Sequence, residues 1–349
     1  KQWRECEFIA AEPPEPQSGQ VVFRVDHFAL TANNISYALA GDALDYWAFF
    51  PAPEGRGRIP VMGYGEVLRS RRDGVSEGER FFGFFPMSTH LAIDAQAAGG
   101  NLIDAAPHRA GHAPAYRQYV RSTEDPIYTS ETEFQIVLLR GLFMTSFLVD
   151  DFLADNAHFG AETLVVSSAS SKTSIALAFQ ASRRGEVRVV GLTSPRNADF
   201  VNSLGLYDQV LPYAEISALP ADVPTVFVDM AGNTDVVRTL HRHLGDALKH
   251  NCVVGATHWD RSGPGEALPG PKPEFFFAPA QIVKRSNDWG GAVFQERLGE
   301  GWKRFCTASD GWLRVQRGRG PEALRRVYLE TLDGRTSPAD GHVLSLWEE

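Results

Sequence analysis

Residues 162–185 read ETLVVSSASSKTSIALAFQASRRG, and this stretch decides the fold. The apolar run at 163–166 predicts a buried strand, and the apolar spacing from Lys172 onward predicts an amphipathic helix. A turn between a parallel strand and a helix places backbone N–H groups and the positive end of the helix dipole at the carboxyl edge of a sheet, where anions bind. The stretch therefore predicts an anion-binding turn in a doubly wound α/β domain.

The turn lacks the glycines that normally let a backbone approach a diphosphate closely. A P-loop is disfavoured, because the upstream glycine and the glycine before the lysine are both missing. The remaining interpretations are an unusual dinucleotide site and a simple helix cap made by Ser170 or Ser171, and the two are compatible. The candidate cofactor contacts in this turn are Ser168, Ser170, Ser171, Lys172 and Thr173.

The next strand, VVGLTSPRNADF at 189–200, bears on the type of cofactor. Sites that prefer NAD place an acidic residue at the end of this strand to bind the ribose hydroxyls. Here no acid precedes Asp199, and the chain offers Thr193, Ser194 and Arg196 instead. Hydroxyl and guanidinium groups suit a 2′-phosphate, so the pattern favours NADP(H). The alternative is a solvated arginine in an ordinary loop.

The rest of the chain divides into two regions with different residue patterns. Residues 20–119 are broken by glycine and proline and contain short β-rich runs, which predict a β-barrel-type domain. From residue 131 apolar strands alternate with amphipathic helices, which predicts a buried parallel sheet with right-handed crossovers. A further strand is expected at EFFFAP, 274–279, a long loop at 261–273, and short strands around a helix at 321–332 in the tail.

Composition and charge exclude several classes of protein. The 349 residues are 43% hydrophobic with a formal net charge of −9, so a large core is available and a general affinity for nucleic acid is not expected. No apolar run is long enough to span a bilayer and no signal-peptide pattern is present, so the expected location is the cytoplasm. The three cysteines, Cys6, Cys252 and Cys306, fit neither a disulfide framework nor a zinc cluster.

The order of these pieces resembles the medium-chain dehydrogenase/reductase superfamily, in its zinc-independent quinone oxidoreductase and enoyl reductase branch. The resemblance rests on VVFRVDHFALTANNISYAL (21–39), RIPVMGYGEVLRSRRDGVSEGERFFGFFPM (58–87) and LFMTSFLVDDFL (142–153). It implies a GroES-like β-barrel-type domain, residues 1–130 and 303–349, and a Rossmann-like nucleotide-binding domain, residues 131–302. LTANNISYALAGDALDYWAFFP (30–51) with RGLFMTSFLVDD (140–151) is more closely similar to a subgroup of that superfamily classed as a domain of unknown function.

The same resemblance implies an active site without metal. Gly63-Tyr64-Gly65-Glu66 stands where zinc-dependent members have their Gly-His-Glu, and three cysteines cannot supply a four-cysteine structural site. Asn33 and Asn34 resemble the active-site asparagine, and of the two Asn33 is expected to bind the cofactor. Tyr37 or Tyr46 resembles a tyrosine that donates a proton or hydrogen bond. Thr145 resembles a threonine near the nicotinamide. The alternatives are a turn-stabilising role for the asparagines and core packing for the tyrosines.

Two functions are expected from these residues. The first is an NADP(H)-dependent, metal-independent reductase of a carbonyl or an activated C=C bond, with Asn34, Tyr37 and Tyr46 as catalytic residues and a small or medium apolar molecule as substrate. The second is a non-catalytic dehydrogenase-like protein that acts as a binding or interaction module, to which the missing glycines point. The apolar segment at 274–280 lies where the resembling family pairs an edge strand, so a homodimer is expected.

Overall fold

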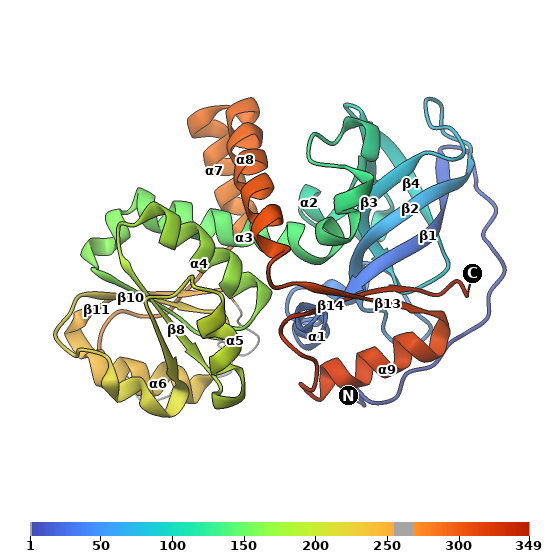
Figure 1. Cartoon of the computed structure of the whole chain (residues 1–349). Coiled ribbons are helices and arrows are strands. Elements are labelled where there is room, and N and C mark those ends of the chain that lie inside the picture. The colour runs from blue at the N-terminus through green and yellow to red at the C-terminus, as the bar shows by residue number, and fades with distance from the viewer. Residues whose placement is uncertain (1, 255–267, 349) are drawn as a thin grey trace. The chain divides into compact units, whose positions relative to one another are not determined.

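The computed structural model describes residues 2–254 and 268–348, which divide into two compact units (Figure 1). Unit 1 comprises Lys1–Leu138 with Leu313–Glu349, and unit 2 comprises Leu139–Trp312. The sequence had placed these divisions at 130/131 and 302/303. In the structure, the division between Leu138 and Leu139 falls inside one continuous helix, α3 (Glu133–Asp155), which therefore contributes residues to both units.

Unit 1 is a β-barrel-type domain. Within its described residues, eight strands follow the order β13-β14-β1-β2-β3-β6-β5-β4, and an additional pairing of β1 with β4 closes six of them into a ring. The strands are β1 (Gln20–Leu30), β2 (Pro60–Ser70), β3 (Arg80–Pro86), β4 (His90–Ala98), β5 (Asn101–Asp104), β6 (Gln118–Arg121), β13 (Arg314–Arg319) and β14 (Asp340–Ser345). Alternate residues of β1, Val21, Phe23 and Val25, enter the core because side chains in a strand point to opposite faces.

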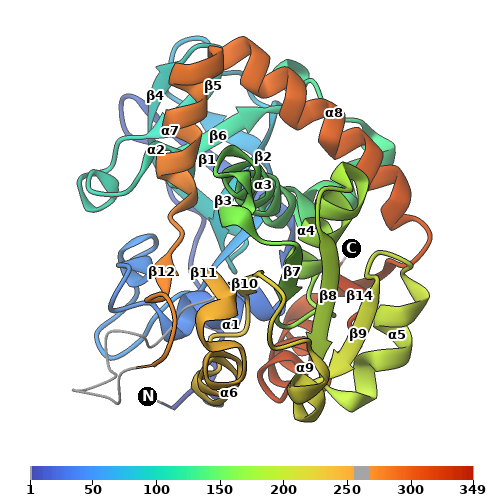
Figure 2. The same ribbon diagram turned by 90° about the vertical axis from the view of Figure 1, so that its left-hand side faces the viewer.

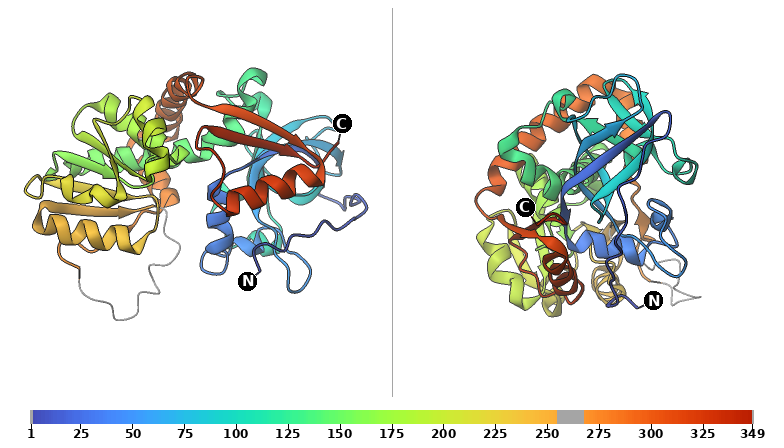
Figure 3. Two further views of the ribbon diagram at one scale, coloured as in Figure 1. Left: turned by 60° about the horizontal axis from the view of Figure 1, so that its bottom comes forward. Right: turned by 90° about the vertical axis from the view of Figure 1, so that its right-hand side faces the viewer.

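Among the described residues, unit 1 is completed by three helices of its own, the first residues of α3 and several short 3₁₀ turns. Helix α9 (Gly320–Leu332) packs along β13 and β14, as the left view of Figure 3 shows, and buries Leu324, Val327 and Tyr328. The others are α1 (Ala32–Leu39), which directly follows β1, and the short α2 (Pro114–Arg117). The 3₁₀ turn η1 (Tyr46–Ala48) follows α1 and carries one of the candidate tyrosines.

Unit 2 is a doubly wound α/β domain, as the sequence predicts. Its described residues form a parallel sheet in the order β12-β11-β10-β7-β8-β9 (Figure 2). The strands are β7 (Thr163–Val166), β8 (Arg188–Thr193), β9 (Gln209–Pro212), β10 (Thr225–Asp229), β11 (Leu248–Val253) and β12 (Glu274–Phe275). One face packs against α3 and α4 (Lys172–Arg184), and the other against α6 (Thr234–Leu244) and the 3₁₀ turn η7 (Tyr213–Ala218). A short helix, α5 (Ala198–Ser203), follows β8.

The segment after β11 differs from the expectation. The strand expected at 274–279 is only two residues long, and helix α7 (Ala278–Trp289) begins inside the expected range with Pro279 in its first turn, a position that suits proline. Helix α8 (Gly291–Ser309) follows and buries Phe305 against Phe143 and Phe179. Most of the expected loop, residues 261–267, lies outside the described residues. No helix among the described residues is long and apolar enough to cross a membrane.

Candidate functional site

The predicted anion-binding turn joins β7 to α4 as expected. Ser168 adopts the left-handed backbone conformation, with φ of +51°, which a glycine normally occupies and which is unusual for other residues. Its backbone N–H donates to the Tyr213 hydroxyl at 2.9 Å. Ser171 is the N-cap of α4, because its Oγ accepts a hydrogen bond from the Ser174 N–H at 3.2 Å. The helix cap expected from the sequence is therefore present at Ser171.

The turn also packs closely on its neighbours. A Cβ atom added to Gly191 of β8 would lie 2.8 Å from the Ala169 Cβ and 2.8 Å from a ring carbon of Tyr207, so only glycine fits there without a shift. The Tyr207 hydroxyl donates to the Ala169 carbonyl at 2.9 Å. A glycine on the adjacent strand thus provides close packing for a turn that has no glycine of its own.

Two buried polar side chains, Ser167 and Asp229, lie at the start of the turn. The Ser167 hydroxyl donates to Asp229 Oδ1 at 2.7 Å and accepts from the Met230 N–H at 2.8 Å. The Asp229 carboxylate also accepts from the Gly232 N–H at 3.1 Å. Burial raises the pKa of Asp229, and the hydroxyl and N–H donors oppose that rise. The carboxyl ends of β7 and β10 are therefore fixed to each other.

The three residues predicted to bind a 2′-phosphate lie at the end of β8. Thr193 is buried, and the Ser194 hydroxyl oxygen is shielded from solvent without a hydrogen-bond partner among the residues that the structure describes. Arg196 is exposed in the 3₁₀ turn η6 (Pro195–Asn197). The Asn197 amide donates to Ser170 Oγ at 3.0 Å and so joins this loop to the anion-binding turn. Asn197 has no signal in the sequence, because this contact depends on the adjacent placement of β7 and β8.

Helix α3 carries the predicted Thr145. The Thr145 hydroxyl donates to the Gly141 carbonyl of its own helix at 3.1 Å. The neighbouring Ser146 is fully buried, and its hydroxyl lies 2.7 Å from the Thr173 carbonyl in the first turn of α4. Ser146 was missed by the sequence reasoning, although a serine in an apolar helix is a signal for a buried hydrogen bond. It holds α3 against the start of α4.

The predicted asparagines of unit 1 have different surroundings. Asn34 Oδ1 accepts from the Thr31 N–H at 2.8 Å, and its Nδ2 donates to the Pro60 carbonyl at 2.9 Å. This amide therefore caps α1 and fixes it to β2, which is the turn-stabilising alternative. Burial raises the pKa of Tyr37, and the Asn33 side chain, as a hydrogen-bond partner of that hydroxyl, opposes the rise.

The two candidate tyrosines lie together in an aromatic cluster. The ring centroids of Tyr37 and Tyr46 are 4.6 Å apart, and Tyr116 of α2 lies 6.1 Å from Tyr46. Burial, together with the neighbouring Tyr116, raises the pKa of Tyr46, so its phenol is neutral at physiological pH. The guanidinium of Arg109, fully buried, donates to the carbonyls of Phe49 and Tyr116 and holds this cluster in place. Neither Tyr116 nor Arg109 was predicted from the sequence.

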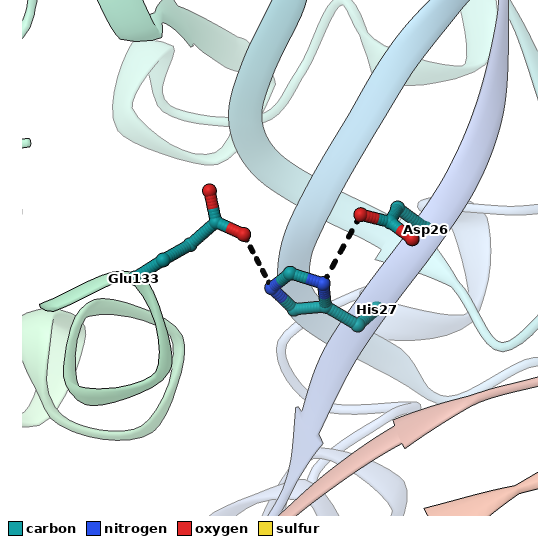
Figure 4. A group of neighbouring side chains, drawn as sticks. All are labelled: Asp26, His27 and Glu133. Carbon is teal, nitrogen blue, oxygen red and sulfur yellow. Dashed lines mark ion pairs between the residues drawn. The ribbon is translucent and has the colours of Figure 1, made fainter. Parts of the chain in front are cut away.

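Unit 1 also contains a charged cluster of Asp26, His27 and Glu133, drawn in Figure 4. His27 Nδ1 lies 3.2 Å from Asp26 Oδ2, and its Nε2 lies 3.1 Å from Glu133 Oε1. Arg80 Nη2 is 2.6 Å from each of those two carboxylate oxygens. A metal ion bound to these oxygens would face the guanidinium charge of Arg80, so the geometry favours a charge-balanced ion-pair network over a metal centre.

The pKa shifts in this cluster agree with a protonated histidine. Although burial opposes it, the two carboxylates raise the pKa of His27 above its usual value. His27 and Arg80 lower the pKa of Glu133 to about 2, also against burial. The hydrogen bond from His27 is the largest influence on Asp26, whose pKa lies well below its usual range. Two carboxylates therefore face Arg80 and a histidine whose pKa is raised.

Comparisons with solved structures identify the fold. CurA in complex with NADPH from Vibrio vulnificus has a TM-score of 0.64 at 13% identity, and the match covers 98% of this chain and 94% of that one. YhdH of Escherichia coli K-12 with bound NADPH has a TM-score of 0.54 at 13% identity, covering 97% and 95%. The YhdH oxidoreductase from Salmonella enterica in complex with NADP has a TM-score of 0.52 at 14% identity, covering 97% and 94%. These likenesses confirm a GroES-like barrel joined to a Rossmann-like domain.

The sequence comparisons identify the family. No curated protein matches this chain significantly. A family model described as "Protein of unknown function (DUF2855)" matches residues 28–337, which is most of the chain. The subgroup expected from the sequence, one classed as a domain of unknown function, is confirmed. The chain belongs to the DUF2855 family.

Proposed function

We propose that this chain is an NADPH-dependent, metal-independent reductase of a carbonyl or an activated C=C bond in a small or medium apolar substrate. The observation that carries the proposal is the turn at 167–171, where a left-handed residue and a capped helix start stand beside a loop with hydroxyl and guanidinium groups. The similar folds of CurA and YhdH, whose structures contain NADPH, add support.

The residues of unit 2 fit a dinucleotide that carries a 2′-phosphate. The start of α4 carries the positive end of the helix dipole and suits a diphosphate. Lys172 adds a full positive charge at the same place. Arg196, which is exposed, would add a charge-assisted hydrogen bond to the 2′-phosphate. The Ser194 hydroxyl, which is shielded and has no partner among the described residues, would gain one there by rotating about its Cα–Cβ bond.

Unit 1 would supply the groups that act on the substrate. When bound, NADPH supplies a hydride. Tyr37 and Tyr46 are neutral phenols, so either can donate a hydrogen bond or a proton to an oxygen that gains negative charge. Asn33 orients Tyr37, while Asn34 fixes the helix that carries both asparagines and Tyr37. Thr145 remains a candidate neighbour of the nicotinamide.

We also propose that the chain forms a homodimer through the edge of the sheet in unit 2. Among the described residues β12 is the last strand at that edge. Phe275 in this strand and Phe277 just after it are 45% and 47% exposed. An open groove of about 350 Å³ lies next to this strand, with Phe152 and Phe276 among its lining residues. Exposed apolar edge strands promote association with another chain.

Titration of the purified protein with NADPH and NADH tests the proposed function. We expect NADPH to bind more tightly than NADH, and a panel of enones, quinones and enoyl thioesters to give saturable NADPH oxidation. Tight NADPH binding with no turnover of the panel would favour the alternative, a non-catalytic dehydrogenase-like module. The Asn34 amide, whose oxygen and nitrogen are both used in capping α1 and fixing it to β2, favours that alternative. Failure to bind either nucleotide would refute the reductase.

A further inference from the structure

Ser170 occupies the most demanding position of the turn. Ser168, Ser170 and Thr173 have the spacing of the three glycines in G-x-G-x-x-G. The second glycine of that motif leaves room for the backbone to approach the diphosphate, so a side chain there competes with the ligand for space. A serine at this position is compatible with a dinucleotide only if its hydroxyl is held in another direction.

Asn197 makes the contact that can hold it. Asn197 is the last residue of the 3₁₀ turn η6 and directly precedes α5, with its backbone in the helical region. Its side chain does not cap α5, and its Nδ2 donates to Ser170 Oγ at 3.0 Å. The backbone of Asn197 is fixed in turn, because its N–H donates to the Ser194 carbonyl at 3.0 Å.

We propose that Asn197 is a positioning residue that turns the Ser170 hydroxyl toward the loop after β8 and so clears the diphosphate position. The inference rests on the proposed function, since it concerns the same dinucleotide site. Without Asn197 the Ser170 side chain can rotate about its Cα–Cβ bond among its staggered rotamers, and some of these place the hydroxyl where the diphosphate binds.

The role makes a specific prediction about the type of cofactor. The diphosphate is common to NADPH and NADH, whereas the 2′-phosphate is present only in NADPH. Asn197→Ala should therefore weaken the binding of both nucleotides equally, by about three- to tenfold, the effect of one neutral hydrogen bond. A role in holding the Arg196 loop would instead weaken NADPH alone.

A double-mutant cycle with Ser170→Gly tests this role. Ser170→Gly removes the side chain that Asn197 controls, so it should keep or tighten nucleotide binding. In the Ser170→Gly background, Asn197→Ala should have no further effect. Dissociation constants are measured by calorimetry for NADPH and NADH, with Asn202→Ala, an exposed asparagine of α5, as the matched control. Melting temperatures of the nucleotide-free variants show whether each one is folded.

Several outcomes would overturn the inference. Asn197→Ala could bind the nucleotides as tightly as the wild type or more tightly, or it could lose affinity for NADPH alone. Ser170→Gly could bind the nucleotides more weakly. The effects of the two substitutions on affinity could also add in the double variant. If the wild-type protein binds neither nucleotide, the proposed function fails and this inference fails with it. If the wild type binds and the cycle is additive, only the role of Asn197 is refuted.

Discussion

Replacing His27 by glutamine should destabilise unit 1 at neutral pH. In the native protein His27 faces Asp26 at 3.2 Å and Glu133 at 3.1 Å, and its side chain is only 11% exposed. Removal of one partner from a buried charge pair costs about 3–5 kcal/mol, because the remaining charges stay buried without compensation. Arg80 still faces both carboxylates, and Asp26 is 32% exposed, so we expect a loss near the lower limit, about 3 kcal/mol.

The pH dependence of this loss has a definite sign. The pKa of His27 is raised in the folded state, so its stabilisation is complete below the unfolded value of about 6.5 and disappears as the pH rises through the folded pKa. Each unit by which a pKa is raised corresponds to about 1.4 kcal/mol of stability. The difference in unfolding free energy between wild type and His27→Gln should therefore be largest below pH 6.5 and should shrink toward alkaline pH.

Urea unfolding followed by circular dichroism between pH 5.5 and 9 measures this difference. Comparing the two proteins at each pH cancels the contributions of other titrating groups, including the buried histidines of unit 2. His108→Gln, which changes an exposed histidine of the same unit, is the matched control and should leave the profile unchanged. A difference that is constant over the whole range would show that His27 stabilises unit 1 by packing and not by its charge.

The other predictions concern the cofactor, metals and assembly. Arg196→Ala should weaken NADPH binding about tenfold and barely affect NADH binding. Equal weakening of both would refute a contact between this arginine and the 2′-phosphate. Lys172→Ala should weaken NADPH binding by about tenfold or more. The nucleotide-free variant should be equally or slightly more stable, because a cation opposes the dipole at a helix start. Unchanged affinity would refute a contact between Lys172 and phosphate. Chelators should change neither activity nor melting temperature, whereas stoichiometric zinc in the purified protein would contradict a metal-free site. Sedimentation should give a dimer mass that Phe275→Glu with Phe277→Glu reduces to a monomer; a wild-type monomer would contradict the edge-strand pairing.

The sequence predicted most of the fold because the elements that define it have strong local signals. The strand before Ser167, the helix from Lys172 and the helix at 234–244 have periodic apolar residues and clear boundaries, and each is found where it was expected. Helices α7 and α8 were missed. The apolar run before Pro279 has strand-like composition, and the buried residues of α8, such as Trp302 and Phe305, are spaced among many polar residues.

The candidate site was less predictable, since its important contacts join residues far apart in the chain. Ser170 and Asn197 are ordinary turn residues in the sequence, and their hydrogen bond exists only because β7 and β8 are adjacent. In the same way, Arg109 reads as a surface residue, although it is fully buried and supports the tyrosine cluster through backbone carbonyls. Pattern reasoning locates elements, but it cannot identify which polar side chains meet across them.

The missing glycines of the turn have physical substitutes in its surroundings. A glycine at the first position would adopt positive φ at no cost, and Ser168 adopts φ of +51° with its N–H bound by Tyr213. Close packing of the turn on the sheet is provided by Gly191 of the adjacent strand. At the second position the clearance that glycine would give depends, in our proposal, on the hydrogen bond from Asn197 to Ser170. Each substitute comes from outside the turn, so the absence of the motif from residues 167–173 does not by itself exclude a dinucleotide site there.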